Sequence, residues 1–169
     1  MRYELLKILL VDDNHHMRVL LAEILRAIGA RHIVEAKDGA EGLQLLRSQP
    51  VDIIMTDLEM QPLDGIDFVR LLRSTKGPSQ MTPVIMITGR FTASRVNEAR
   101  NAGVDEFLAK PLTARGVLER VALVIDRPRA YVQTASYFGP DRRRRNDPNW
   151  EGPWRRNTDP RQQAALPKT

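Results

Sequence analysis

The stretch LLKILLVDDN, residues 5–14, decides the fold because it joins an apolar run to a pair of carboxylates. The run Leu5–Val11 is nearly continuous rather than alternating, which is typical of a strand covered on both faces in a parallel sheet. The apolar residues after it recur at spacings of three and four: Met17, Leu20, Leu21, Ile24, Leu25 and Ile28. Gly29 follows directly and is typical of a helix end. The pattern predicts a strand followed by an α-helix.

The same strand–helix unit recurs along residues 1–126. Four further strands are predicted at Ile33–Glu35, Val51–Thr56, Val84–Thr88 and Asp105–Leu108. The helices between and after them are predicted at Ala40–Leu46, Phe68–Leu72, Ser94–Ala102 and Arg115–Val124. We therefore expect an α/β fold, a doubly wound five-stranded parallel sheet with helices on both faces and right-handed connections.

Length and composition exclude several classes of protein. The 169 residues fit one domain plus a tail. The absence of cysteine excludes disulfides, thiolate metal sites and a cysteine nucleophile, and it suits a reducing compartment. The longest apolar runs fall far short of the roughly 20 residues of a membrane helix. We expect a soluble, cytoplasmic protein with no membrane insertion.

The net charge of +5 is unevenly distributed. Residues 1–126 hold 16 basic and 17 acidic side chains, whereas residues 127–169 hold 10 and 4. This second segment has both tryptophans, but its only Ile, Leu, Val or Met residues are Val132 and Leu166. It has too few aliphatic groups to offset ordering costs of about 1–2 kcal/mol per residue. We expect a domain at 1–126 and an extended, partly disordered tail at 127–169, with residues 130–169 mobile in the absence of ligand.

Polar residues end or follow the predicted strands. They are the acidic pair Asp12–Asp13, then Asp57, Thr88 and Lys110. In a doubly wound sheet these positions meet at the carboxyl edge, where clustered carboxylates repel unless a divalent cation such as Mg²⁺ neutralises them. The alternative is that the acidic pair, with Asn14, caps the next helix. Capping requires neither the hydroxyl nor the ammonium group, so the sequence predicts a metal site.

These residues resemble a response-regulator receiver domain of the CheY type over about residues 5–126. The matching motifs are Asp12–Asp13, Asp57-Leu58-Glu59-Met60, Leu63-Asp64-Gly65, Thr88, Phe107 and Lys110-Pro111. The resemblance implies a flavodoxin-like receiver fold and a signalling protein that receives phosphate from a histidine kinase. It implies no enzyme activity beyond the protein's own phosphorylation and dephosphorylation.

The resemblance also implies a role for each matching residue. Asp57 would be the phosphoacceptor, and Asp12 and Asp13, with Asp57 and the backbone of Glu59, would hold Mg²⁺. Lys110 would contact the phosphoryl group, and Thr88 and Phe107 would form the switch. Two positions depart from the family pattern: Gln61 stands where a proline is expected, with Pro62 one place later, and Phe107 lacks the hydroxyl of the commoner tyrosine.

The basic groups of the tail are nearly all arginine, with Lys168 the one lysine among ten cations. Arginine favours planar, bidentate recognition of phosphate and guanine, and aromatic side chains offer faces on which bases stack. The candidate ligand residues are Tyr137, Arg142, Arg143, Arg144, Arg145, Trp150, Trp154, Arg155 and Arg156. They predict binding of a guanine nucleotide. The alternatives are a solvated linker, a protein partner alone, or nonspecific nucleic-acid binding, and we do not expect nucleic acid to be the partner.

The motif YFGPDRRRR, residues 137–145, resembles the tail of CheY-like cyclic-di-GMP effectors. This resemblance implies that the tail binds cyclic-di-GMP and that the protein is recruited to a flagellar motor switch protein or a surface-sensing partner. The alternative is a plain single-domain response regulator, phosphorylated on Asp57, whose tail makes protein contacts only.

Overall fold

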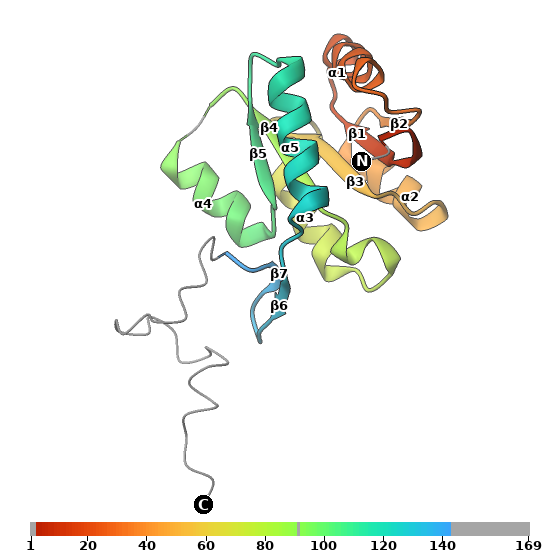
Figure 1. Ribbon diagram of the computed structural model, residues 1–169. Helices are drawn as coiled ribbons and strands as arrows, with labels where there is room; N and C mark the ends of the chain where they lie inside the picture. Colours follow the sequence, from red (N-terminus) through yellow and green to blue (C-terminus); the bar gives the residue numbers. More distant parts are fainter. Residues whose placement is uncertain (1–2, 91, 143–169) are drawn as a thin grey trace, which may run out of the picture.

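The computed structural model describes residues 3–90 and 92–142. Five parallel strands form its central sheet in the order β2-β1-β3-β4-β5 (Figure 1). The strands are β1 (Lys7–Val11), β2 (His32–Ala36), β3 (Ile53–Asp57), β4 (Val84–Thr88) and β5 (Glu106–Ala109). The predicted doubly wound fold is therefore confirmed.

Five α-helices cover the two faces of the sheet. They are α1 (His15–Ala27), α2 (Gly39–Ser48), α3 (Gly65–Ser74), α4 (Ala93–Ala102) and α5 (Ala114–Asp126). Leu9 and Val11 of β1 pack in one core with α2, α3 and α4, whereas Ile8 and Leu10 pack in the other core with α1 and α5. Successive side chains of a strand point to opposite faces, so this one apolar run supplies both cores.

The ends of the first strand–helix unit show how local chemistry sets its limits. Gly29 has φ 104°, and the N–H groups of Gly29 and Ala30 donate to the carbonyls of Arg26 and Leu25, which closes the end of α1 as predicted. The strand begins at Lys7 rather than at the predicted Leu5, because Tyr3–Leu5 form a short 3₁₀ turn, labelled η1. A second short 3₁₀ turn, η2, spans Pro78–Met81.

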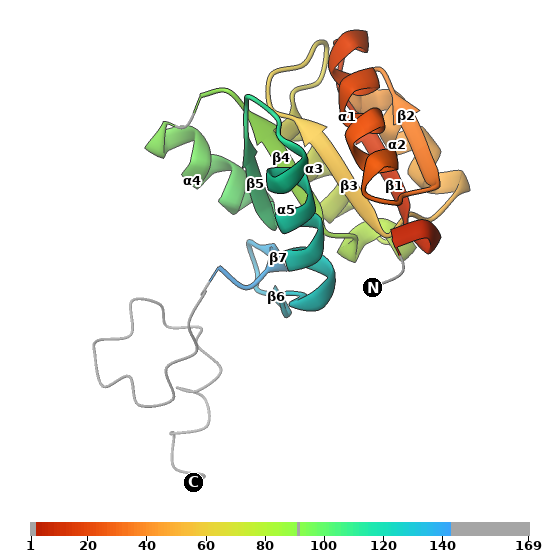
Figure 2. The same ribbon diagram turned by 45° about the horizontal axis from the view of Figure 1, so that its top comes forward.

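A two-stranded antiparallel hairpin follows α5. It consists of β6 (Tyr131–Gln133) and β7 (Phe138–Pro140), and Figure 2 shows it beside the last turns of α4 and α5. The expectation of a mobile segment from residue 130 is therefore wrong for residues 130–142. The rings of Tyr131 and Phe138 lie against each other within the hairpin, with centroids 5.8 Å apart, and the guanidinium of Arg73 on α3 lies over the Tyr131 ring. Residues 143–169 lie outside the described part of the chain.

The described helices include none that is both long enough and apolar enough to cross a membrane.

Candidate functional site

The acidic residues predicted to meet at the carboxyl edge do come together there. Asp57 is the last residue of β3, and Asp12 directly follows β1, the neighbouring strand in the sheet. Both are buried, with exposed fractions of 6% and 7%, whereas Asp13 is exposed to solvent. The site therefore has two shielded carboxylates and a third at its rim.

Lys110 supplies the cation of the site. Its Nζ lies 2.7 Å from Oδ1 of Asp57. The backbone N–H of Lys110 donates to the carbonyl of Thr88 at 2.9 Å, which holds the lysine at the end of β4. The side chain of Lys110 retains 29% exposure, so the pair is open to solvent on one side. One carboxylate is thus paired with an accessible ammonium group.

The acidic pair does not cap α1. Asn14 is the N-cap, and its side-chain oxygen accepts from the N–H groups of His16 and Met17. Oδ1 of Asp12 instead accepts from the N–H of Asn14 at 2.8 Å, and Oδ2 of Asp13 accepts from the N–H of Gln61 at 3.0 Å. The capping alternative holds for Asn14 and leaves the two aspartates available to the site.

Burial raises the pKa of Asp12, and the nearby charges of Asp57 and Asp13 raise it further. The N–H bond from Asn14 and the charge of Lys110 oppose this rise in pKa. The carboxylates are thus close enough to repel one another, and a divalent cation with oxygen ligands would relieve this repulsion.

The donor set fits Mg²⁺, which takes carboxylate and carbonyl oxygens and usually keeps several waters. Within residues 3–90 and 92–142, no three His, Cys, Asp or Glu side chains form a ready-made metal cluster. A cation held here would therefore combine the carboxylates of Asp12, Asp13 and Asp57 with other oxygens, such as the backbone carbonyl of Glu59 and water.

Of the two predicted switch residues, Thr88 ends β4 at the carboxyl edge, and Phe107 lies within β5 opposite Met86. Thr88 is 3% exposed, and its hydroxyl accepts from the N–H of Arg90 and donates to the carbonyl of Arg90. Phe107 is half-buried against the core on the α2–α4 side, and its carbonyl accepts from Nε of Arg120. The hydroxyl of Thr88 is therefore engaged within its own loop in this conformation.

A cavity of about 360 Å³ opens at the rim of the site. Its lining residues are Asp13, Glu59, Met60, Gln61, Asp64 and Arg95. Sequence reasoning assigned no role to Arg95, whose guanidinium joins Oδ2 of Asp64 at 3.1 Å and Glu98 at 2.9 Å. The three-residue spacing of Arg95 and Glu98 on one helix could have predicted their ion pair. The pairing of Arg95 with Asp64 across two helices leaves no local pattern.

Of the nine residues predicted to bind a nucleotide, the described chain contains Tyr137 and Arg142. The guanidinium carbon of Arg142 lies 4.1 Å from the centroid of the Tyr137 ring, and Nη1 of Arg142 donates to Oδ1 of Asn101 at 2.6 Å. The other seven lie outside the described residues: Arg143, Arg144, Arg145, Trp150, Trp154, Arg155 and Arg156.

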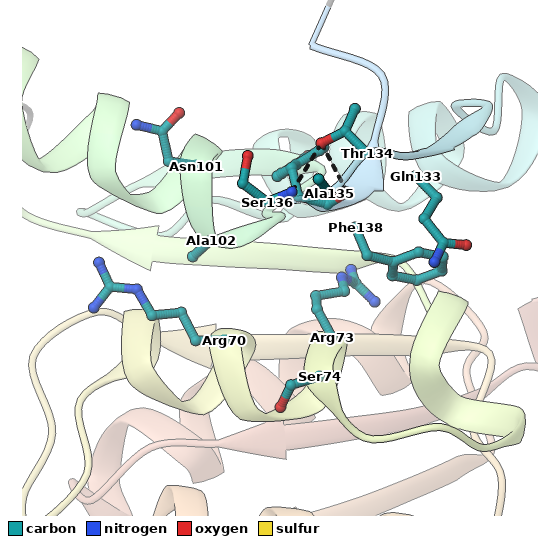
Figure 3. A pocket seen from close by; sticks show the side chains of 11 residues that line it. Arg70, Arg73, Ser74, Asn101, Ala102, Gln133, Thr134, Ala135, Ser136 and Phe138 are labelled. Carbon is teal, nitrogen blue, oxygen red and sulfur yellow. Dashed lines mark hydrogen bonds between the residues drawn. The ribbon is translucent and has the colours of Figure 1, made fainter. Parts of the chain in front are cut away.

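A second cavity, of about 290 Å³, lies between the hairpin and the C-terminal ends of α3 and α4. Figure 3 shows Arg70 and Arg73 on one side of it and hairpin residues such as Thr134 and Phe138 on the other. Arg70 is paired with Asp67 and with Glu98. Its charge is therefore already balanced within the fold.

The fold and the acidic site together define a response regulator receiver domain, and the family of that description matches residues 8–122. The chain therefore belongs to this family, whose CheY-type members are non-enzymatic signalling domains.

Similar proteins support this assignment. The chemotaxis protein CheY of Pseudomonas aeruginosa is 34% identical over 122 residues, which cover 72% of this chain and 98% of that protein. CheY-3 of Vibrio cholerae has the same identity over 122 residues, covering 72% of this chain and 93% of its own length.

Solved structures give the same result. Vibrio cholerae CheY4 superposes with a TM-score of 0.66 at 27% identity, covering 70% of this chain and 98% of its own. A second structure is the receiver domain of a sensor histidine kinase from Pseudomonas aeruginosa, solved with a magnesium ion coordinated in its active site cleft. It superposes with a TM-score of 0.62 at 27% identity, and the match covers 70% of this chain and 94% of that domain. The family match ends at residue 122, before the arginine-rich tail, and lends no support to the resemblance to cyclic-di-GMP effectors.

Proposed function

We propose that this protein is a response regulator that accepts a phosphoryl group on Asp57 from a histidine kinase. The observation that carries this proposal is the 2.7 Å contact between Nζ of Lys110 and Oδ1 of Asp57, set among the carboxylates at the carboxyl edge. A buried carboxylate beside an accessible ammonium group can act as a nucleophile, because the cation offsets the charge of the incoming phosphoryl oxygens.

Each residue of the site would have a separate role in phosphoryl transfer. A carboxylate oxygen of Asp57 forms the new O–P bond while the bond from phosphorus to the donor breaks. Lys110 would neutralise a phosphoryl oxygen, and Asp12, Asp13, Asp57 and the Glu59 carbonyl would hold the Mg²⁺. The metal, when bound, offsets negative charge on the transferring group. Thr88 would exchange its bonds to Arg90 for one to the phosphoryl group, and Phe107 would repack.

Incubation of the full chain with acetyl phosphate and Mg²⁺, followed by intact-mass measurement, tests the acceptor. Asp57→Asn should abolish the phosphorylated species, because the amide is a far weaker nucleophile. The matched control is Asp52→Asn, since Asp52 accepts a hydrogen bond from the N–H of Lys7 at the opposite edge of the sheet. Phosphorylation that survives in Asp57→Asn would refute the assignment.

The output of this receiver is inferred from its relatives. Two of the similar proteins are chemotaxis proteins. We propose that the phosphorylated protein docks on a flagellar motor switch protein, where it would be recruited from the cytoplasm. A pull-down with the motor switch protein of the same organism, with and without beryllofluoride, tests this. Equal capture by the wild type and by Asp57→Asn would count against it.

A second proposal is that the tail, residues 127–169, binds cyclic-di-GMP. It rests on the arginine-rich sequence and on one described feature, the stacking of the Arg142 guanidinium on the Tyr137 ring. Arginine held in this way is prepared for a planar anionic or guanine group. This proposal ranks behind phosphorylation because the family match covers residues 8–122 and does not extend to the tail.

Calorimetric titration of cyclic-di-GMP into the full chain tests this second proposal. Replacement of Arg142–Arg145 by alanine should weaken binding at least tenfold, because each lost charged hydrogen bond is worth about 1.5–3 kcal/mol. Replacement by lysine should restore little, since lysine keeps the charge but loses the planar fork. A lysine variant that binds equally well and also accepts any oligonucleotide would indicate an unspecific polyanion binder.

A further inference from the structure

The hairpin is attached to the amino edge of the sheet, where β4 and β5 begin, by polar contacts with buried residues. The hydroxyl of Tyr131 donates to the carboxylate of Asp105, with oxygen distances of 3.3 and 3.4 Å. The guanidinium carbon of Arg73 lies 5.1 Å from the centroid of the same tyrosine ring. Nη2 of Arg129, just before the hairpin, pairs with Glu106 at 3.3 Å. Tyr131 of the hairpin and Arg129 before it therefore contact Asp105 and Glu106, where β5 begins.

The hairpin also contacts the last turn of α4. Nη1 of Arg142 donates to Oδ1 of Asn101 at 2.6 Å. Gly139 lies against Gly103, the C-cap of α4, so closely that a Cβ on Gly139 would be 3.1 Å from Cα of Gly103. The N–H of Asp141 donates to the carbonyl of Ala130 at 2.7 Å and closes the base of the hairpin. These contacts require a close approach of backbones and are specific to this packing.

The first turn of α4 lies at the phosphorylation site. Thr92 caps the helix, and Arg90, two residues earlier, is the residue whose backbone bonds to the hydroxyl of Thr88. Arg95 pairs with Asp64 and lines the cavity at the rim of the site. The ten-residue helix α4 therefore begins close to Thr88 and Arg90, and its last turn contacts the hairpin through Asn101.

We propose that residues 130–142 form a strap that couples phosphorylation of Asp57 to the position from which the arginine-rich tail leaves the domain. This inference rests on the proposed phosphorylation of Asp57. When Thr88 turns to the phosphoryl group, it releases the backbone of Arg90, and α4 moves as a rigid element. Its last turn then moves relative to the hairpin and weakens the contacts of Asn101 and Gly103. Phosphorylation loosens the strap.

Thermodynamic linkage makes this coupling reciprocal. A variant that weakens the strap removes part of the resistance to movement of α4, so it should bind a phosphoryl analogue more tightly. Asn101→Ala deletes the bond to Arg142 from an exposed position and should not unfold the domain. The matched control is Arg115→Ala, because Arg115 forms an exposed pair with Glu119 in the first turns of α5, an element other than α4 and the hairpin.

Amide hydrogen exchange of the full chain, with and without beryllofluoride and Mg²⁺, tests the proposal. We expect the amides of Thr134 and Asp141, which bond within the hairpin, to exchange at least threefold faster with the analogue bound. Asn101→Ala should bind beryllofluoride at least threefold more tightly, and Arg115→Ala should bind it like the wild type.

The active-site amides of Leu58 and Lys110 separate the two hypotheses. If they become protected while the hairpin exchanges at an unchanged or slower rate, the strap is refuted and the proposed function stands. If they do not respond, the proposed function fails, and the strap, which rests on it, fails with it.

Discussion

The two edges of the sheet each hold one buried carboxylate paired with a cation, but the two pairs are built differently. At the carboxyl edge, Lys110 contacts Asp57 at 2.7 Å and keeps 29% of its side chain exposed. At the amino edge, Arg73 contacts Asp105 at 3.0 Å, and their side chains are 3% and 4% exposed. The first pair is open to water and the second is sealed from it.

The hydrogen bonds of the two cations differ in the same way. Arg73 donates to the carbonyls of Gly103, Gln80 and Thr82 as well as to Asp105. Its guanidinium is therefore saturated by the fold, as a buried charge must be. Lys110 has a single carboxylate contact and faces an acidic cluster. The guanidinium of Arg73 thus has its hydrogen bonds satisfied within the fold, whereas the ammonium group of Lys110 remains available to a phosphoryl oxygen.

The largest expected loss of stability comes from breaking the buried pair of Arg73 and Asp105. Arg73→Met should lower the free energy of unfolding by about 3–5 kcal/mol, because it leaves the carboxylate of Asp105 buried without its cation. Lys110→Met should cost less stability than Arg73→Met, because the Lys110 side chain is 29% exposed although Asp57 is buried, and it should abolish the response to acetyl phosphate. Urea unfolding measures both values. Equal losses of stability in the two variants would contradict the distinction between the edges.

The next prediction sharpens the description of the open edge. Asp13→Asn should weaken Mg²⁺ binding at least tenfold, about 1.4 kcal/mol, because it removes a charged oxygen ligand from the rim of the cluster. The fold should be unaffected, as Asp13 is exposed. Magnesium titration followed by amide shifts of the active-site residues measures the affinity. Asp52→Asn, at the opposite edge, should bind Mg²⁺ as the wild type does, and unchanged affinity in Asp13→Asn would remove Asp13 from the site.

The open edge was predictable from the sequence because its residues occupy fixed positions relative to local patterns. Asp12 and Asp57 each end or follow an apolar run, and parallel strands bring such ends together. Apolar patterns also predicted the succession of strands and helices along the chain, and Gly29 predicted the end of the first helix. The limits of the elements shifted by a few residues, as at Lys7, because a short turn competes with the strand for Leu5.

The sealed edge was not predictable in the same way. Arg73 lies at helical spacing from the buried residues Val69 and Leu72, a pattern that places it on the buried face of the helix. An arginine in such a pattern is nevertheless expected to reach solvent unless its buried partners are known. Its hydrogen-bond partners come from two other stretches of the chain, residues 80–82 and 103–105. The hairpin was missed for the same reason, because Tyr131 is held by Asp105, 26 residues away, rather than by neighbours in the sequence. Contacts of this kind leave no local periodicity.

A smaller effect is expected at Gly103, where the sealed edge meets the hairpin. Gly103 has φ 107°, and a Cβ there would lie 3.0 Å from Cγ of Arg73. Gly103→Ala should therefore cost about 1–2 kcal/mol, from left-handed backbone strain alone. Gly77→Ala is the matched control, because nothing lies within 4 Å of its added Cβ and its backbone is extended. Thermal unfolding of both variants measures the difference, and equal melting temperatures would contradict the left-handed backbone conformation of Gly103.

The smallest effect concerns the pKa of Asp105. Burial raises this pKa to about 6, against the opposing charge of Arg73 and the hydrogen bonds from Val84 and Tyr131. The folded state therefore binds this proton more tightly than the unfolded chain, whose aspartate has the ordinary pKa of 3.8. The stability that this proton contributes is complete below about pH 4 and is lost as the pH rises through about 6.

Tyr131→Phe removes a donor that favours the carboxylate, so it should raise the pKa of Asp105 further and extend this window upward. The ¹³C shift of the Asp105 carboxyl, followed against pH in the wild type and in the variant, measures the change. Tyr137→Phe should leave the midpoint nearly in place, because the hydroxyl of Tyr137 donates to the carbonyl of Pro140 instead. A midpoint that does not move in Tyr131→Phe would mean that the hairpin does not bind Asp105 in solution. The saturation that distinguishes the amino edge would then come from Arg73 alone.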